Sequence, residues 1–151
     1  MFRSTVIAAT LAITFSSAQA APPLTVKVYN AGGNSFNVNA TLIAGEKEAI
    51  VIDAGFTRAD ALRIAANVLD SGKQLTTIYV SQADPDYYFG VETLKEIFPQ
   101  ADVVSTRAVL DKLVPKLAGK VAFWGPKMGA NAPRQPVVPR ALEGTVLKLD
   151  G

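Results

Sequence analysis

The order of apolar patterns along the chain is the feature that most restricts its fold. Three β-type segments come first, at residues 24–29, 36–43 and 48–53, and the third is apolar on both faces, as in a central strand. After Gly55, helical and β-type patterns alternate, with a long loop before the last β-type segment. The predicted order β-β-β-α-β-α-β-α-β indicates an α+β fold in which helices pack on a mixed sheet.

Start and stop signals divide the second part of the chain. Residues 57–60 form a capping box that opens a helix, and the β-rich run at residues 76–81 follows that helix. Two shorter helices then flank a strand at residues 102–105. The stretch at residues 119–140 is rich in glycine and proline and predicts a long loop, and residues 145–149 predict a final strand.

Residues 1–20 have the three parts of a secretory signal. Arg3 charges the start, residues 5–15 form an uncharged apolar run too short to span a bilayer, and Ala20 ends the small-residue pattern A-x-A. We expect this signal to be removed, leaving residues 21–151 as one domain with no membrane span. A chain without cysteine suits export to a bacterial periplasm better than it suits a disulfide-stapled secreted domain.

The composition excludes several kinds of functional site. The 151 residues include neither histidine nor cysteine, so no imidazole or thiolate can bind a metal and no Ser-His-Asp triad can form. The net charge is only +2, and the basic residues form no stripe, so we expect no nucleic-acid partner. Any chemistry must use carboxylates, amides, hydroxyls, lysines or the backbone.

The segment at residues 81–90 is the strongest candidate for a functional site. It lies directly after a predicted buried strand and directly before a helix, which is where α/β sheets place their sites. Asp84-Pro85-Asp86 is also an ordinary strand-to-helix connector, and Asp86 could simply cap the following helix. Taken alone, these residues favour the interpretation as a turn.

Landmarks along most of the chain resemble those of the metallo-β-lactamase superfamily. Residues 81–90 follow the order of its H-x-H-x-D-H-x-x-G motif, residues 51–55 resemble its strand ending in D-x-G, and residues 98–104 resemble its F-P-x-A-x-V turn and strand. Residues 34–43 and 142–151 resemble two further segments in the same order. The resemblance implies an αββα sandwich of two similar halves with metals at the seam. This chain resembles the N-terminal half only, so the domain at residues 21–151 is expected to be incomplete.

The resemblance also assigns candidate site residues. Gln82, Asp84 and Asp86 occupy positions of the metal motif, as does Tyr87, and Asp86 is the candidate catalytic residue by resemblance only. The family binds zinc, which prefers nitrogen and sulfur ligands, whereas these side chains offer only oxygen. We therefore expect no bound metal, or a weakly bound divalent ion such as magnesium, calcium or manganese. Asp53 is expected, again by resemblance, to tie loops together near the site.

Two functions remain open at this point. In the first, the chain is an exported protein of metallo-β-lactamase fold whose degenerate metal site is inactive as a zinc hydrolase, kept as a binding or assembly domain. In the second, it is a fragment or variant of a metal-dependent hydrolase of esters, amides or thioesters. The small-molecule substrate is not indicated in either case. Because half a sandwich leaves one sheet face uncovered, we also expect self-association through that face.

Overall fold

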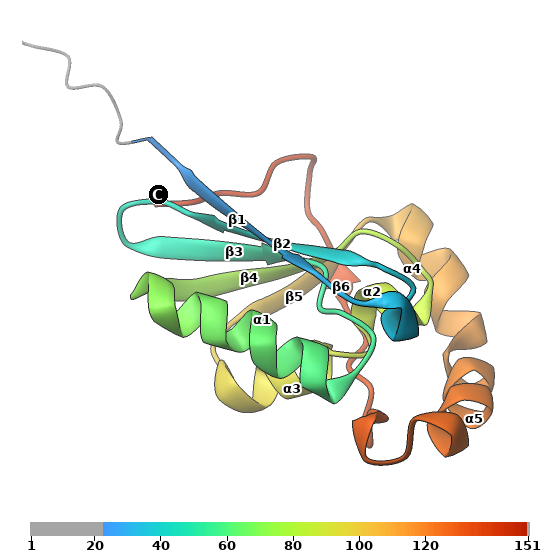
Figure 1. Ribbon diagram of the computed structural model, residues 1–151. Helices are drawn as coiled ribbons and strands as arrows, with labels where there is room; N and C mark the ends of the chain where they lie inside the picture. Colours follow the sequence, from blue (N-terminus) through green and yellow to red (C-terminus); the bar gives the residue numbers. More distant parts are fainter. Residues whose placement is uncertain (1–22, 151) are drawn as a thin grey trace, which may run out of the picture.

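A six-stranded mixed sheet, with its strands in sequence order, forms the centre of the fold (Figure 1). The computed structural model describes residues 23–150. Strands β1, β2 and β3 pair antiparallel, and β3, β4, β5 and β6 pair parallel. The strands are β1 (Thr25–Asn30), β2 (Asn39–Ala44), β3 (Glu48–Ile52), β4 (Gln74–Val80), β5 (Asp102–Ser105) and β6 (Arg140–Ala141).

Helices join the parallel strands, and α1 and α3 lie together on one side of the sheet (Figure 1). The helices are α1 (Arg58–Ser71), α2 (Pro85–Tyr88), α3 (Val91–Ile97), α4 (Arg107–Leu113) and α5 (Leu117–Met128). Short 3-10 turns occur at Gly33–Ser35, Val114–Lys116 and Gly129–Asn131. The predicted α+β class is confirmed. The expected signal at residues 1–20 lies outside the described residues, so export stays a prediction. Within residues 23–150, no helix is both long and apolar enough to cross a bilayer.

The capping box predicted for α1 is present. The backbone N–H of Asp60 donates to the Thr57 hydroxyl at 3.0 Å, and the Asp60 carboxylate accepts from the backbone N–H of Thr57 at 3.1 Å. Apolar side chains then recur at helical spacing and are buried against the sheet. They are Ala61, Ile64, Ala65 and Val68. The helix ends at Gly72, whose φ of 66° is the left-handed conformation that glycine adopts without strain.

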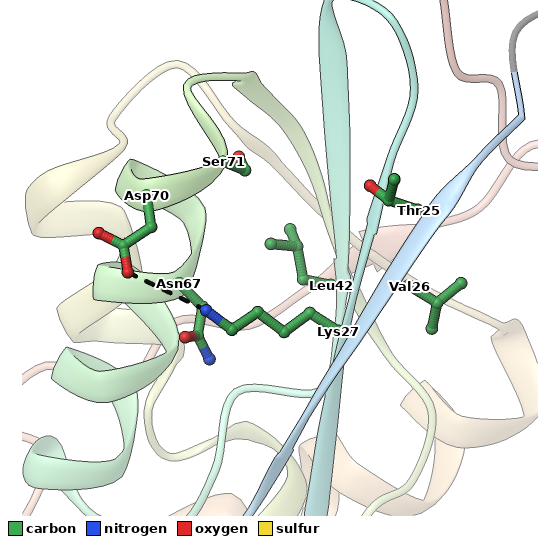
Figure 2. A pocket seen from close by; sticks show the side chains of 7 residues that line it. All are labelled: Thr25, Val26, Lys27, Leu42, Asn67, Asp70 and Ser71. Atoms are coloured by element: carbon green, nitrogen blue, oxygen red, sulfur yellow. Dashed lines mark ion pairs between the residues drawn. The ribbon is translucent and has the colours of Figure 1, made fainter.

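The sequence of strand β1 alternates as predicted, but the strand is not half-buried, because residues 25–28 are all exposed and only Tyr29 is partly buried. Val26 is 63% exposed and Val28 is 47% exposed, because α1 packs on the opposite face of the sheet. Lys27 points to that helical side, where its ammonium lies 4.0 Å from the Asp70 carboxylate at a cavity of about 250 Å³, while Val26 points away (Figure 2). Leu24, at the start of the strand, is also exposed. The sheet thus presents uncovered apolar side chains at its β1 edge.

The loop predicted at residues 119–140 is wrong for its first part, which is helix α5. Partly buried apolar side chains of this helix recur at intervals of four, three and four residues and pack against the core. They are Leu117, Val121, Trp124 and Met128. This contact holds the segment helical although it contains two glycines and Pro126, because burial of an apolar stripe outweighs weak intrinsic propensity.

The final strand predicted at residues 145–149 is also wrong. The last strand is β6, and the chain beyond it runs back to the turn between β2 and β3. There the Asp150 carboxylate accepts backbone N–H groups of Lys47 at 3.0 Å and Glu48 at 2.9 Å. This end of the chain is therefore held by a side chain on a turn and not by a strand ladder.

The second predicted strand begins three residues later than expected. Phe36 and Asn37 have φ angles of 58° and 55°, in the left-handed region that no strand residue occupies. Pairing with β1 therefore starts at Asn39, and Phe36 leaves the apolar face on which Val38 is buried.

Candidate active site at the end of strand β4

Two loops meet at the carboxyl ends of β3 and β4 and carry the candidate site. The backbone N–H of Ala54 donates to the Tyr87 carbonyl at 2.8 Å, and the N–H of Gly90 donates to the Gly55 carbonyl at 3.0 Å. A side chain at position 90 would overlap the Ala54 carbonyl and come within 2.9 Å of the Ala61 methyl group. Glycine at this position therefore lets the loop after β4 lie directly on the loop after β3.

Asp53 ties the same two loops together, as the family resemblance implied. It is 5% exposed, and its carboxylate accepts the Ser81 backbone N–H at 2.8 Å and the Ser81 hydroxyl at 2.6 Å. Burial raises the pKa of Asp53 to about 6, although the hydrogen bonds from Ser81 lower it, and the charge of Asp86 adds to the rise. Asp53 has a left-handed backbone with a φ of 63°, which turns the chain out of the sheet.

The structure brings two of the candidate metal-motif residues to one cavity. Asp84 and Asp86 line a cavity of about 260 Å³, whereas Gln82 is not among its lining residues. The Asp84 carboxylate lies 2.9 Å from the ammonium of Lys120, which comes from α5. Burial raises the pKa of Asp86, and the charge of Asp84 adds to the rise while that of Lys120 opposes it.

These residues do not fit the tetrahedral zinc site of a hydrolase. Within residues 23–150, no group of three or more His, Cys, Asp or Glu side chains is gathered closely enough to hold a metal ion. The donors at the motif positions are oxygens only, and one of the two carboxylates already pairs with Lys120. The degenerate site and its three proposed ligands, Gln82, Asp84 and Asp86, stay predictions.

Aromatic rings form the remaining wall of the cavity. Phe36, Phe56 and Trp124 line it together with Asp84, Pro85, Asp86 and Lys120. The sequence analysis assigned none of Phe36, Lys120 and Trp124 to the site. Trp124 packs against the core and also lines the cavity, so it anchors α5 and borders the site at once. The helical spacing of Leu117, Val121 and Trp124 was the signal that could have placed α5 here.

A sequence model of the metallo-beta-lactamase superfamily matches residues 33–147. The chain belongs to the metallo-β-lactamase superfamily. Solved metallo-β-lactamases also share its fold. MEM-A1, a subclass B3 enzyme from a soil metagenome library, is 27% identical over 74% of this chain and 42% of its own, with a TM-score of 0.53. BLEG-1, also subclass B3, is 19% identical over 83% of this chain and 57% of its own, with a TM-score of 0.60.

A third structure extends the comparison within this superfamily. The Cronobacter sakazakii metallo-β-lactamase with the HARLDQ motif is 24% identical over 75% of this chain and 44% of its own, with a TM-score of 0.52. No curated protein matches the chain. The chain spans about half the length of the metallo-β-lactamase structures that it matches. The described sheet and helices therefore correspond to part of a metallo-β-lactamase fold.

Proposed function

We propose that this chain is a binding domain of metallo-β-lactamase fold that does not hydrolyse substrates with zinc. The observation that carries the proposal is that the motif positions offer only oxygen donors, and one of these donors, the Asp84 carboxylate, is paired with Lys120. The Lys120 ammonium supplies positive charge beside Asp84, at a rim where members of this family bind zinc. Export to a periplasm remains part of the proposal, on the pattern of residues 1–20 alone.

The ion pair by itself is a weak obstacle to a metal ion. The two side chains are 31% and 67% exposed, so water screens their attraction and the pair contributes only about 0–1 kcal/mol. The donor chemistry is the stronger argument, because carboxylate and amide oxygens without imidazole suit magnesium or calcium and not a tight zinc site. The alternative, a metal-dependent hydrolase of esters, amides or thioesters, would need ligands other than these.

Restoring histidine at three motif positions tests the proposal. The substitutions Gln82→His, Asp84→His and Tyr87→His together are expected to raise zinc affinity by at least about tenfold, because imidazole nitrogen is a preferred zinc ligand. We expect neither the wild-type protein nor this variant to hydrolyse β-lactams or esters strongly. The measurements are zinc titration by calorimetry and hydrolysis assays with zinc added.

The same assays can contradict the binding-domain proposal. Zinc-dependent hydrolysis by the wild-type protein that disappears on Asp86→Ala would establish the hydrolase and remove the binding-domain proposal. Asp111→Ala is the matched control, since this aspartate lies on α4 outside the motif and should leave any activity unchanged.

We also propose that the uncovered side chains of β1 mediate self-association. Leu24, Val26 and Val28 are exposed on one face of an edge strand, and contiguous exposed apolar surface marks an interaction site. Val26→Lys is expected to shift the protein toward monomer in sedimentation velocity. Leu69→Lys, at an exposed leucine of α1, should leave the distribution unchanged. A wild-type protein that is monomeric at all concentrations would contradict this.

A further inference from the structure

Three aromatic rings border the cavity at steep angles to one another. The ring of Phe56 lies 5.3 Å from that of Phe36 at 67° and 5.2 Å from that of Trp124 at 87°, and Phe36 lies 5.6 Å from Trp124 at 74°. Phe56 is buried and also stacks on Phe89 at 5.9 Å. The faces of aromatic rings carry partial negative charge, and a cation within about 6 Å of a ring centre is attracted to that face.

Phe36 lies at this cavity at the end of the 3-10 turn Gly33–Ser35. Its φ of 58° is rare for a bulky residue, and its ring is 54% exposed while it contacts Phe56 and Trp124. The turn that carries Phe36 is held in place by the neighbouring Ser35, whose hydroxyl donates to the buried Asp60 carboxylate at 2.6 Å. The phenyl ring is thereby presented at the cavity and to solvent together.

The charges that line the cavity do not balance. Asp84 is paired with Lys120, whereas no cationic side chain within residues 23–150 forms an ion pair with Asp86. The lining therefore carries two carboxylates against one ammonium. A half-buried carboxylate beside aromatic rings attracts a positive ligand, and an anionic ligand would meet Asp86 and Asp84 first.

The chain already holds ammonium groups in this neighbourhood. Lys120 lines the cavity itself, and about two turns further along α5 the Lys127 ammonium lies 3.5 Å from the centre of the Phe123 ring. This second contact is a cation–π interaction next to Trp124, whose ring lies 4.9 Å from that of Phe123. An alkylammonium group thus already lies on an aromatic face close to the cavity, although Phe123 and Lys127 do not line it.

We propose that the cavity lined by Phe36, Phe56, Trp124 and Asp86 binds a small organic ammonium ion. This inference rests on the proposed binding function and names its ligand class. In this proposal the rings contact the alkyl groups and attract the cation, and the Asp86 carboxylate neutralises the charge of the cation. A volume of about 260 Å³ limits the ligand to a small molecule of a few carbon atoms around the nitrogen.

Choline and its neutral isostere 3,3-dimethylbutan-1-ol provide the direct test. The two molecules share their shape and differ in charge, so a cation site binds choline at least about tenfold more tightly in titrations followed by NMR. Trp124→Leu and Asp86→Asn should each weaken choline binding by about tenfold. Phe123→Leu is the matched control, because Phe123 is 55% exposed and does not line the cavity.

The variant Lys120→Met is expected to raise choline affinity, whereas the variants above lower it. Removing the resident ammonium frees Asp84 and should tighten choline binding, whereas a cavity that recognises an anion would lose affinity with this variant. Equal binding of choline and its isostere, or weaker choline binding by Lys120→Met, overturns the ammonium site. If the protein binds no choline and also has neither zinc nor hydrolytic activity, the ammonium site is wrong while the proposed binding function is not contradicted. Thermal unfolding of each variant confirms that it is folded.

Discussion

Replacing Gly90 with alanine is expected to destabilise the fold by about 3 kcal/mol, the upper part of the usual range for overpacking a core. The new methyl group would overlap the Ala54 carbonyl, which is backbone and cannot move aside, and would press on Ala61 of α1 at 2.9 Å. Its backbone φ of −71° is ordinary, so the cost comes from space and not from conformation. Urea unfolding followed by circular dichroism measures the change.

Gly119→Ala is the matched control for this prediction. Gly119 lies inside α5, and nothing stands within 4 Å of the position a methyl group would take. Alanine there should stabilise the protein by up to about 1 kcal/mol through its higher helix propensity. Equal stabilities of Gly90→Ala and the wild-type protein would mean that the two loops after β3 and β4 do not pack as described.

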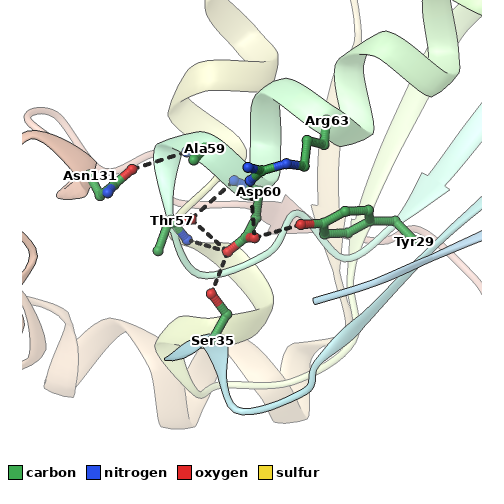
Figure 3. A network of polar contacts seen from close by, with 7 residues as sticks. All are labelled: Tyr29, Ser35, Thr57, Ala59, Asp60, Arg63 and Asn131. Carbon is green, nitrogen blue, oxygen red and sulfur yellow. Dashed lines mark hydrogen bonds and ion pairs between the residues drawn. The ribbon is translucent and has the colours of Figure 1, made fainter. Parts of the chain in front are cut away.

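Replacing Asp60 with asparagine is expected to cost about 3 kcal/mol, because it removes a buried charge that several donors are arranged to meet. The carboxylate is buried and accepts the Tyr29 hydroxyl at 2.7 Å, the Ser35 hydroxyl at 2.6 Å and the Thr57 hydroxyl at 2.6 Å (Figure 3). The neutral amide keeps one acceptor and turns an N–H₂ toward these hydroxyls. Asp70→Asn, at an exposed aspartate of the same helix, should change stability by less than about 0.5 kcal/mol.

The same carboxylate has a defined pH dependence. Burial raises the pKa of Asp60, but the hydrogen bonds from Ser35, Thr57 and Tyr29 lower it more, so the net direction is downward. A carboxyl group with a lowered pKa in the folded state stabilises the protein above its unfolded pKa, near 4, and loses this contribution as the pH falls. The stability difference between the wild-type protein and Asp60→Asn should therefore shrink below about pH 4. A difference that stays constant down to pH 2 would contradict the assigned role.

The sequence predicted the parts of the fold that local patterns determine. The alternation in β2, the doubly apolar β3 and the capping box at Thr57 each produced the expected element. Helix α5 was missed because its two glycines and Pro126 are local signals for a loop, whereas its stability comes from Trp124 packing on distant residues. Strand periodicity in β1 likewise shows which side chains share a face, but not which face α1 will cover.

The sequence likewise predicted only part of the candidate site. Asp84 and Asp86 lie in one short segment, so the order of motif residues was enough to find them. Lys120 and Phe36 reach the cavity from other elements, 36 residues after Asp84 for the lysine, and no local pattern joins such positions. The charge that balances Asp84 and the aromatic wall therefore became visible only when the chain was folded.

Zinc content is the measurement that tests the central claim most directly. Protein purified without chelators, given equimolar zinc and then desalted, is analysed for metal by mass spectrometry. A site built from oxygen donors, with Lys120 already beside Asp84, should retain far less than one zinc ion per chain. One zinc ion per chain, lost together with hydrolytic activity on Asp86→Ala, would show that the chain holds a functional metal centre.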